Sequence, residues 1–557
     1  MEHVRLIAAI ALSLAIFLVW DFFFVDRRPV PPSAPPVETT ERAPERTETG
    51  PGPITDERME PKPPGEELPT HVPDHTFETI SVETGLYKAV ISDRGAAIIR
   101  FDLKEYRENP APDAPHMALI PESNRMGTAL VGLSGTDEPL YRQIFATDFT
   151  GRELKVENAP ETLSFFWQSD NGLILEKRYT FYPDKYNIDM TVRVRNESEG
   201  IIDRNLSITM TNPPPDDSKR FTFSGPFIFI DQDLNQVKIS DIQEKGTYSG
   251  SIQWAGIEDN YFMTALIPRE ATNTSVVLAV DERSNLLNST FQQPMNPLAP
   301  GSVSQFDYQL FMGPKKLSLL QEFGYDLDRI VDFGIFSVIA KPALWLMNAI
   351  HDNIIANYGI AIILLTLLIK AVFWPLGNKS YKSMGEMRKI QPLMMEIRNK
   401  YKDDKKKMNE EVMNLYKTYK INPLSGCLPM VVQIPVFIAF YRMLSEAIEL
   451  RHAPFMLWIN DLSAPDRLFD FNVTIPLMAQ PAGIPVLTII MGATMFLQQK
   501  LAPPPGDPMQ AKIMMMLPIV FTFIFINFPA GLVLYWLVNN VVSIAQQYNV
   551  NRKITQS

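Results

Sequence analysis

The chain has 557 residues, which exceeds one ordinary domain, so two or more domains are expected. Its formal net charge of −11 argues against nucleic-acid specificity, and its single cysteine excludes an internal disulfide. It contains no CxxC pair, zinc-ligand spacing, P-loop or GxGxxG after a strand, so we expect no metal and no nucleotide cofactor.

Residues 1–28 are expected to form a transmembrane anchor. The apolar run 6–25 is about 20 residues long, enough for a hydrocarbon core of ~30 Å. A cleaved signal peptide is the alternative, but Asp26, Arg27 and Arg28 follow the run in place of a small-residue cleavage site. Residues 29–75 are rich in Pro and Glu and poor in apolar residues, which predicts an extended tether.

Residues 76–322 are expected to form a β-sandwich domain. In segment 185–196, Ile188, Met190 and Val192 alternate with Asp189 and Thr191, and this period of two is typical of a strand. The letters PDK join it to the preceding run LILEKRYTFY as a hairpin, and a second strand pair is expected around residues 93–95. Regular short strands over such a length predict a large sandwich.

Residues 323–376 are expected to combine a helix lying in the membrane interface, at 328–336, with a second span at 361–376, AIILLTLLIKAVFWPL. Residues 422–551 contain four further apolar segments, roughly 427–443, 484–497, 513–528 and 532–544. Some are short for a full span, which predicts tilt or a thinned bilayer. The fold class is therefore a multi-pass α-helical membrane protein, with a five-helix core, an N-terminal anchor and a large β domain.

The distribution of basic residues predicts the orientation. Segment 378–422 is dense in Lys and Arg, and the positive-inside rule places it in the cytoplasm. Counting spans from there places the β domain outside and both termini, including the short tail 552–557, in the cytoplasm. The expected location is the cell inner membrane, with the large domain in the periplasm.

Residues 377–421 predict a cytoplasmic helical hairpin with an apolar seam. The charged run YKDDKKK separates its two arms, and Pro392 is expected to kink or restart the first arm. Apolar residues recur at helical spacing on both arms: Met384, Met387, Met394 and Ile397, then Met408, Val412, Leu415 and Tyr419. A solvated hairpin explains the lysines, whereas the methionines also suit an adaptable landing surface for a partner, and the sequence leaves both open.

Lys370 lies in the middle of the second span. It is eight residues before Asn378, or ~12 Å from the cytoplasmic end, and half of the hydrocarbon core is ~15 Å. Snorkelling is the alternative, but helical side chains lean toward the N-terminus, which here is the outer side. A lipid-exposed cation costs at least ~2.5–3.5 kcal/mol, so we expect Lys370 to face a water-filled cavity in the bundle.

Further polar residues in the apolar segments are candidates to line the same cavity. The alternative for each is a hydrogen bond between helices that stabilises the bundle, and for Asn539 and Asn540 the sequence favours neither interpretation. The candidates are Thr366, Gln433, Asn527, Asn539, Asn540 and Ser543.

Three other functions fit the residues less well. A secondary transporter also places charge at mid-membrane, but would show two related halves, and none is visible. An intramembrane protease needs a buried Ser and His; Ser425 is a candidate, but His351 and His452 lie at predicted outer margins. A sugar-modifying β domain is the third alternative, and no acid–base pair can be assigned from its few histidines, His71, His75 and His116.

The string NPLSGCLPMVVQIPVFIAFYRML at 422–444 resembles the third-span motif of the YidC/Oxa/Alb membrane protein insertases. LIKAVFWPL, EMRKIQPLM, ELRHAPFMLWINDLSAPD and FPAGLVLYWLVNNVVSIAQQ resemble further motifs of the family, in the same order over residues 330–551. The anchor, tether and β domain match its Gram-negative branch, whose periplasmic domain is a β-supersandwich similar to sugar mutarotases.

The resemblance implies an insertase, with no catalysed reaction and no cofactor, that moves nascent membrane proteins through a cytoplasm-open hydrophilic groove. Lys370 stands where the family typically has Arg, so it keeps the charge but lacks the planar fork. The implied partners are the Sec translocon, the ribosome through the cytoplasmic loops, and the lipid bilayer, with the protein acting as a monomer. The short tail NRKITQS lacks the long basic extension that some relatives use for ribosomes.

The resemblance also implies residue roles. Substrate contacts are implied at Ile434, Pro435, Phe437 and Trp536, with Thr366 matching a position tied to substrate contact and core packing. The hairpin motif maps onto Met384, Met387, Arg388, Gln391 and Pro392.

Overall fold

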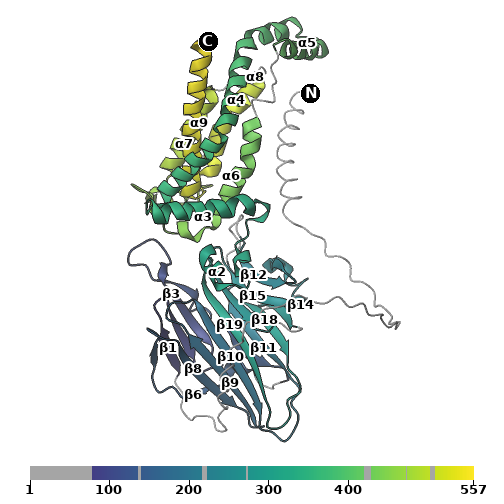
Figure 1. Cartoon of the computed structure of the whole chain (residues 1–557), viewed down its shortest axis with the longest axis vertical. Coiled ribbons are helices and arrows are strands. Elements are labelled where there is room, and N and C mark those ends of the chain that lie inside the picture. The colour runs from purple at the N-terminus through teal and green to yellow at the C-terminus, as the bar shows by residue number, and fades with distance from the viewer. Residues whose placement is uncertain are drawn as a thin grey trace, which may run out of the picture. The chain divides into compact units, whose positions relative to one another are not determined.

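The computed structural model describes residues 78–135, 139–215, 223–270, 274–419, 428–471, 473–501 and 508–556 (Figure 1). These residues all belong to one compact unit, Leu68–Ser557. The anchor expected at 1–28 and the tether expected at 29–75 lie outside the described residues and stay predictions.

The first part of the described chain is a β domain of three main sheets, drawn from purple to teal in Figure 1. The largest has nine strands in the order β13-β12-β15-β16-β19-β10-β9-β8-β6. Their bounds are β6 (Ala146–Thr147), β8 (Glu161–Gln168), β9 (Leu173–Phe181), β10 (Asn187–Asn196), β12 (Gly225–Ile230), β13 (Asp233–Gln236), β15 (Ile252–Glu258), β16 (Phe262–Pro268) and β19 (Val303–Pro314).

Two five-stranded sheets complete the domain, in the orders β14-β17-β18-β11-β5 and β4-β3-β2-β1-β7. The first comprises β5 (Leu130–Leu133), β11 (Asn205–Asn212), β14 (Thr247–Gly250), β17 (Thr274–Asp281) and β18 (Leu286–Pro294). The second comprises β1 (Thr79–Glu83), β2 (Tyr87–Ser92), β3 (Ile98–Arg107), β4 (His116–Ile120) and β7 (Glu153–Lys155). The predicted β-sandwich is therefore confirmed.

The hairpin predicted from alternating residues is also confirmed. Strands β9 and β10 pair antiparallel, with Met190 opposite Tyr179 and Val192 opposite Lys177. Ile188, Met190 and Val192 are fully buried, because the alternation directs them into the core between the sheets. The second predicted strand pair is also present: β2 and β3 pair antiparallel, and residues 93–97 connect them.

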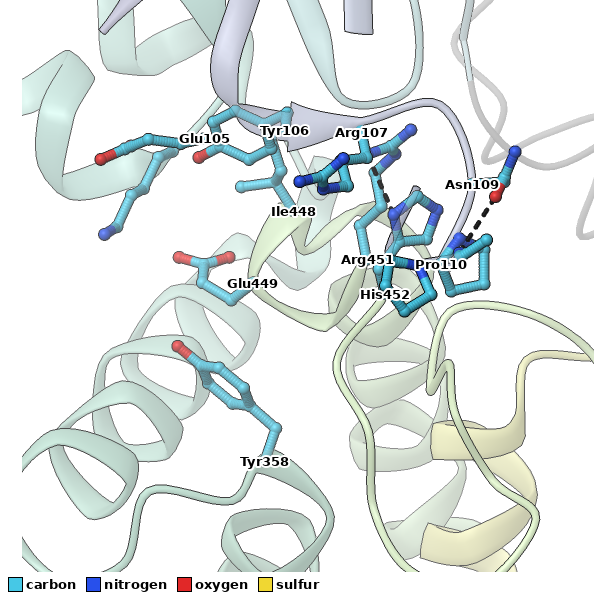
Figure 2. Close-up of a pocket in the computed structure, with 13 residues that line it drawn as sticks. Glu105, Tyr106, Arg107, Asn109, Pro110, Tyr358, Ile448, Glu449, Arg451 and His452 are labelled. Carbon is cyan, nitrogen blue, oxygen red and sulfur yellow. Dashed lines mark hydrogen bonds between the residues drawn. The ribbon is translucent and has the colours of Figure 1, made fainter. Parts of the chain in front are cut away.

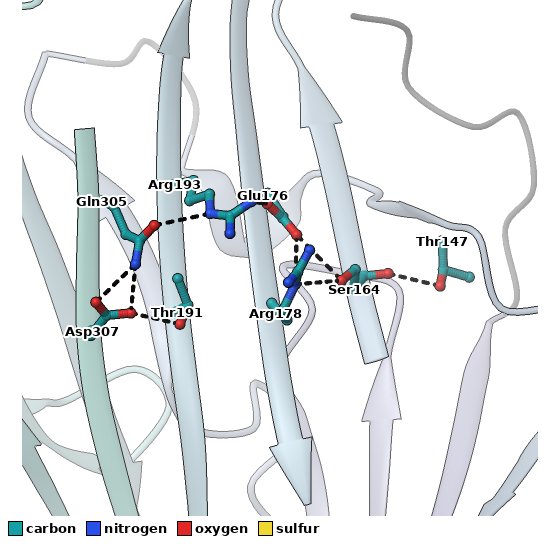
Figure 3. Close-up of polar contacts among 8 residues, drawn as sticks. All are labelled: Thr147, Ser164, Glu176, Arg178, Thr191, Arg193, Gln305 and Asp307. Atoms are coloured by element: carbon teal, nitrogen blue, oxygen red, sulfur yellow. Dashed lines mark hydrogen bonds and ion pairs between the residues drawn. The ribbon is translucent and has the colours of Figure 1, made fainter. Parts of the chain in front are cut away.

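The other face of the same strands carries a row of polar contacts that runs across the large sheet (Figure 3). Glu176 on β9 is almost fully buried and contacts Arg178 at 3.0 Å and Arg193 at 3.2 Å. On β10, the Thr191 hydroxyl donates to Asp307 of β19 at 2.7 Å. Such pairs on neighbouring strands fix the register of the sheet.

Lys177 lies in the core of the β domain. Its ammonium donates to the carbonyl oxygens of Gly95, Ala96 and Ala129 at 3.2, 2.8 and 2.6 Å. The Tyr179 hydroxyl donates to the same Ala96 oxygen at 2.8 Å. An ammonium has three donors, so the backbone satisfies all of them without a carboxylate. This lysine therefore ties β9 to two loops of the domain.

The second part of the described chain is helical, green to yellow in Figure 1. Its elements are α2 (Leu317–Phe323), α3 (Ser337–Asn353), α4 (Tyr358–Lys400), α5 (Lys405–Thr418), α6 (Leu428–Glu446), α7 (Val486–Leu501), α8 (Pro508–Phe525) and α9 (Ala530–Gln556). Two short strands, β20 (Leu468–Phe471) and β21 (Ala482–Ile484), pair in the segment between α6 and α7.

The helix predicted at 328–336 is wrong. Two 3₁₀ turns occupy this segment, Leu327–Ile330 and Gly334–Phe336, and the α-helix begins only at Ser337. Gly334 adopts a φ of 62°, which breaks a helix. The Asp332 carboxylate accepts from the Gly334 N–H at 2.9 Å and from the Ser337 hydroxyl at 3.1 Å, so it stabilises a turn there instead.

By length and hydropathy, α4 is the one helix in the described part of the chain that could cross a membrane. Its 43 residues continue without a break through Pro375 and Pro392. The predicted second span and the first arm of the hairpin therefore form a single helix, so of the kink or restart expected at Pro392 the restart does not occur. Helix α7 and the segment Ala511–Phe525 are apolar but shorter.

Candidate functional site

The site is built on α4. The Asn357 side chain caps this helix by accepting from the Ile360 N–H at 3.0 Å, and its amide donates to the Phe455 carbonyl at 3.0 Å. Lys370 follows 12 residues after Tyr358, or ~18 Å along the axis. The cap and the helical rise therefore hold Lys370 deep within the apolar part of α4.

The Lys370 ammonium contacts α9. It donates to the Ser543 hydroxyl at 2.7 Å, and that hydroxyl donates to the Asn539 carbonyl one turn earlier at 2.7 Å. Within the described ranges, Lys370 has no other hydrogen bond and no ion pair. Two of its three N–H donors are thus without a protein acceptor, although the residue is half-buried.

Helix α9 presents a polar face to its neighbours. The Asn539 amide oxygen accepts from Gln433 of α6 at 2.5 Å, and Asn540 donates to the Thr494 hydroxyl of α7 at 3.3 Å. One turn beyond Ser543, Gln546 donates to Asn378 of α4 at 2.9 Å. This face therefore links α9 to three helices through hydrogen bonds, as the alternative interpretation of these residues expects.

The close approach of α4 to α9 depends on a glycine. A Cβ atom at Gly377 would lie 2.8 Å from the Gln546 Nε2 atom. Sequence reasoning missed Gln546, Asn378 and Thr494. The sequence did contain a signal for Gln546, because this residue follows Asn539 and Ser543 at helical spacing and therefore lies on the same face of the helix.

Two of the implied substrate-contact residues lie together. The Phe437 and Trp536 rings meet edge to face at 4.5 Å between centroids, and Trp536 meets Phe525 of α8 at 4.8 Å. Ile434 is 47% exposed on α6, next to Pro435. The helices α6, α8 and α9 therefore share an aromatic cluster, while Ile434 remains open to an apolar contact.

Neither Thr366 nor Asn527 forms a hydrogen bond with Lys370. Thr366 is buried, and its hydroxyl donates to the Ile362 carbonyl of its own helix at 2.7 Å. Asn527 lies in the turn between α8 and α9, where its oxygen accepts from the Ala479 N–H at 2.8 Å and from Arg467 at 3.2 Å. Asn527 precedes α9, and Ser543 lies 13 residues after the first residue of that helix, Ala530, or ~20 Å along its axis.

The predicted apolar seam between α4 and α5 is present only in part, since Tyr419 of the predicted second stripe is 51% exposed. Met394 is buried, and the Tyr416 hydroxyl donates to its sulfur at 3.2 Å. Asp404 caps α5 by accepting from the Lys407 N–H at 3.0 Å. The family-motif residues lie toward the surface: Met384, Met387 and Gln391 are half-buried, and Arg388 and Pro392 are exposed.

Comparisons with known proteins cover almost all of the described chain. Residues 79–346 match the model of the YidC periplasmic domain, and residues 349–557 match that of the 60Kd inner membrane protein. Membrane protein insertase YidC of Syntrophus aciditrophicus is 41% identical over 482 residues, covering 86% of this chain and 85% of the relative. Its counterpart from Pelobacter propionicus is 39% identical over 559 residues and covers 99% of both chains.

A solved structure is also similar, a crystal structure of an active YidC insertase with the first transmembrane domain resolved. It is 18% identical, covers 85% of this chain and 93% of its own, and gives a TM-score of 0.36.

Proposed function

The chain belongs to the YidC family of membrane protein insertases, and we propose that a polar recess around Lys370 is where its clients enter the membrane. The family acts in the inner membrane and carries a periplasmic domain. Its activity is the insertion of membrane proteins rather than a catalysed reaction, so its substrates are nascent membrane proteins.

The observation that supports this recess best is the incomplete hydrogen bonding of Lys370. One protein acceptor, the Ser543 hydroxyl, serves three N–H donors. Leaving a charged donor buried without a partner costs far more than a hydrogen bond contributes. Water that reaches Lys370 from the cytoplasmic side would supply the missing acceptors, which is the physical argument for a hydrated groove.

A hydrated groove lowers the barrier to insertion. A polar client segment would otherwise cross ~30 Å of hydrocarbon, and a wet recess half-way across shortens that distance. The positive charge of Lys370 attracts acidic client segments into it. A transmembrane segment then leaves along exposed apolar residues such as Ile434 on α6, driven by burial at ~25 cal/mol per Å² of apolar surface.

The five-span topology belongs to the same proposal. We assign the other four spans to α6, α7, α8 and α9, with both termini in the cytoplasm. Helix α7 has 16 residues and α8 has 18, or ~24 and ~27 Å, which are short for a bilayer of ordinary thickness. Short spans favour a locally thinned membrane, which would lower the insertion barrier further.

The cytoplasmic hairpin is proposed as the receiving surface for clients and for the ribosome. Its seam holds α5 against α4, while Met395 and Met413 remain 51% and 52% exposed. Methionine side chains adapt to varied partners, which suits a surface that handles many clients. We propose that the protein acts as a monomer, alone or with the Sec translocon.

A charge reversal in reconstituted liposomes tests the recess. Lys370→Glu should lower insertion of single-span clients with acidic translocated tails by about tenfold or more, because the recess then repels them. Lys370→Arg should retain insertion. Lys155→Glu, an exposed position in the β domain, is the matched control and should insert normally. Normal insertion by Lys370→Glu would contradict charge attraction as the mechanism.

A further inference from the structure

A cavity of about 430 Å³ lies where the end of β3 meets the start of α4 and the segment after α6 (Figure 2). This volume is within the range of small-molecule sites. Most of its lining is charged, polar or aromatic, including Glu105, Tyr106, Arg107, Tyr358, Glu449 and Arg451. It lies ~18 Å along α4 from Lys370, so it is separate from the recess proposed above.

Apart from Lys316, which lines the cavity and acts on Glu449, the charges in this cavity are segregated. In Figure 2, Glu105 and Glu449 lie toward one side, while Arg107 and Arg451 lie toward the other. Tyr106 and Tyr358 border the space beside the carboxylates. The cavity therefore offers an acidic, aromatic half and a basic half.

Glu449 supplies an unpaired negative charge. Its carboxylate accepts from the Asn348 amide at 3.0 Å and forms no ion pair with any described residue. Burial raises the pKa of Glu449 above its usual range, and the Asn348 hydrogen bond and the charge of Lys316 offset only part of this rise. A ligand ammonium would provide the missing ion pair.

Arg451 supplies an unpaired positive charge. Its guanidinium packs over the Phe262 ring at 5.2 Å and donates to the Glu108 carbonyl at 3.4 Å, and no described carboxylate forms an ion pair with it. Burial lowers the pKa of Arg451. The planar fork of arginine is well suited to bind a phosphate oxygen pair.

The cavity lies at the edge of the apolar layer. Tyr358, which borders it, is the first residue of α4, and the apolar run of that helix follows directly. Tyrosine is enriched at the level of lipid headgroups. With α4 oriented as proposed above, this level is that of the outer leaflet.

We propose that this cavity binds the zwitterionic headgroup of an aminophospholipid from the outer leaflet. The phosphate lies at Arg451 and Arg107, and the ammonium lies at Glu449 beside the aromatic faces of Tyr106 and Tyr358. The inference rests on the orientation given under the proposed function. A lipid is favoured over a client polypeptide because headgroups always surround this level, so even a site of modest affinity is occupied.

Photo-crosslinking tests the occupant directly. The full-length protein carries p-benzoylphenylalanine at Asn109, which lines the cavity, in vesicles of phosphatidylethanolamine and phosphatidylglycerol during active insertion. We expect a crosslink whose mass matches phosphatidylethanolamine. The same label at exposed Arg125 is the control and should give none. A crosslink to client polypeptide, to phosphatidylglycerol alone, or to nothing would overturn the proposal.

Charge-removing variants test the two halves of the cavity. Glu449→Gln and Arg451→Gln should each lower the crosslink yield by about tenfold, the effect of one lost charge-assisted contact. Equal yields in the variants would overturn the proposal, and an unchanged melting temperature excludes misfolding. Soluble phosphoethanolamine or inorganic phosphate should not compete, and if either does, the site is one for a free phosphate compound.

The two proposals fail separately. Loss of the headgroup crosslink with normal insertion overturns the lipid site alone. If the Lys370→Glu variant inserts clients as well as the wild-type protein does, the proposed recess is contradicted, but the lipid crosslink is unaffected.

Discussion

Lys177 in the β domain and Lys370 in α4 are both lysines without a carboxylate partner, yet their surroundings differ in one respect. Three backbone carbonyls accept from Lys177, whereas one hydroxyl accepts from Lys370. A lysine whose donors are all satisfied by the protein stabilises the fold. A lysine whose N–H groups lack protein acceptors needs water or a ligand to accept from them. The number of protein acceptors around the ammonium therefore distinguishes a structural lysine from a functional one.

The largest expected effect on stability is that of replacing Lys177, and the same replacement at Lys370 is its comparison. Lys177→Met should destabilise the protein by about 3 kcal/mol, since three carbonyls lose their donor, which corresponds to ~6–12 °C in melting temperature. Lys370→Met should change stability by less than about 0.5 kcal/mol, because few protein contacts are lost. Heat denaturation of the full-length protein in detergent measures both. Equal losses of stability would contradict the distinction between the two lysines.

The second prediction concerns pH. Burial lowers the pKa of Lys177 below its ordinary value, so between its folded-state pKa and ~10.4 the unfolded chain binds more protons at this residue than the folded chain. The free energy of unfolding should therefore rise with pH in this window, by at most ~1.4 kcal/mol per pH unit. Lys177→Met should remove this contribution. An identical pH slope in the variant would show that Lys177 has an ordinary pKa.

The smallest expected effect is at Ser543. Ser543→Ala removes the single protein acceptor of Lys370 and should cost less than about 0.5 kcal/mol in stability, while insertion continues because water replaces the hydroxyl. Thr522→Ala is the control, because its hydroxyl donates to Pro518 within its own helix. If insertion collapses in Ser543→Ala alone, the hydroxyl and not water holds the ammonium in place.

Local patterns predicted local structure well. The β9–β10 hairpin followed from alternating residues, and the burial of Met394 between α4 and α5 followed from helical spacing, because each depends on neighbours in sequence. The role of Lys177 was not predictable in this way. Within LILEKRYTFY, the charge of Lys177 suggests a residue that faces solvent. The carbonyl groups that accept from it are 48 to 82 residues distant in the sequence.

The candidate site shows the same limit. Lys370 was identified because it is a single cation within an apolar run. Its partner Ser543 was not paired with it, because the two residues are 173 positions apart in the sequence. Asn527 carried the same signal as Asn539, a polar residue inside an apolar string. The chain turns at Asn527 to join α8 to α9, where it binds Arg467 and the Ala479 N–H, a tertiary arrangement that residue spacing does not reveal.

Water access to position 370 is the most direct test of the account. Lys370→Cys in a Cys427→Ser background would be exposed to a membrane-impermeant thiol reagent from the cytoplasmic side, with Leu368→Cys, which is exposed on the apolar part of α4, as the control. We predict that position 370 is labelled and position 368 is not, because water reaches the first and lipid surrounds the second. If both cysteines stay unlabelled, position 370 is dry and no hydrated recess surrounds it.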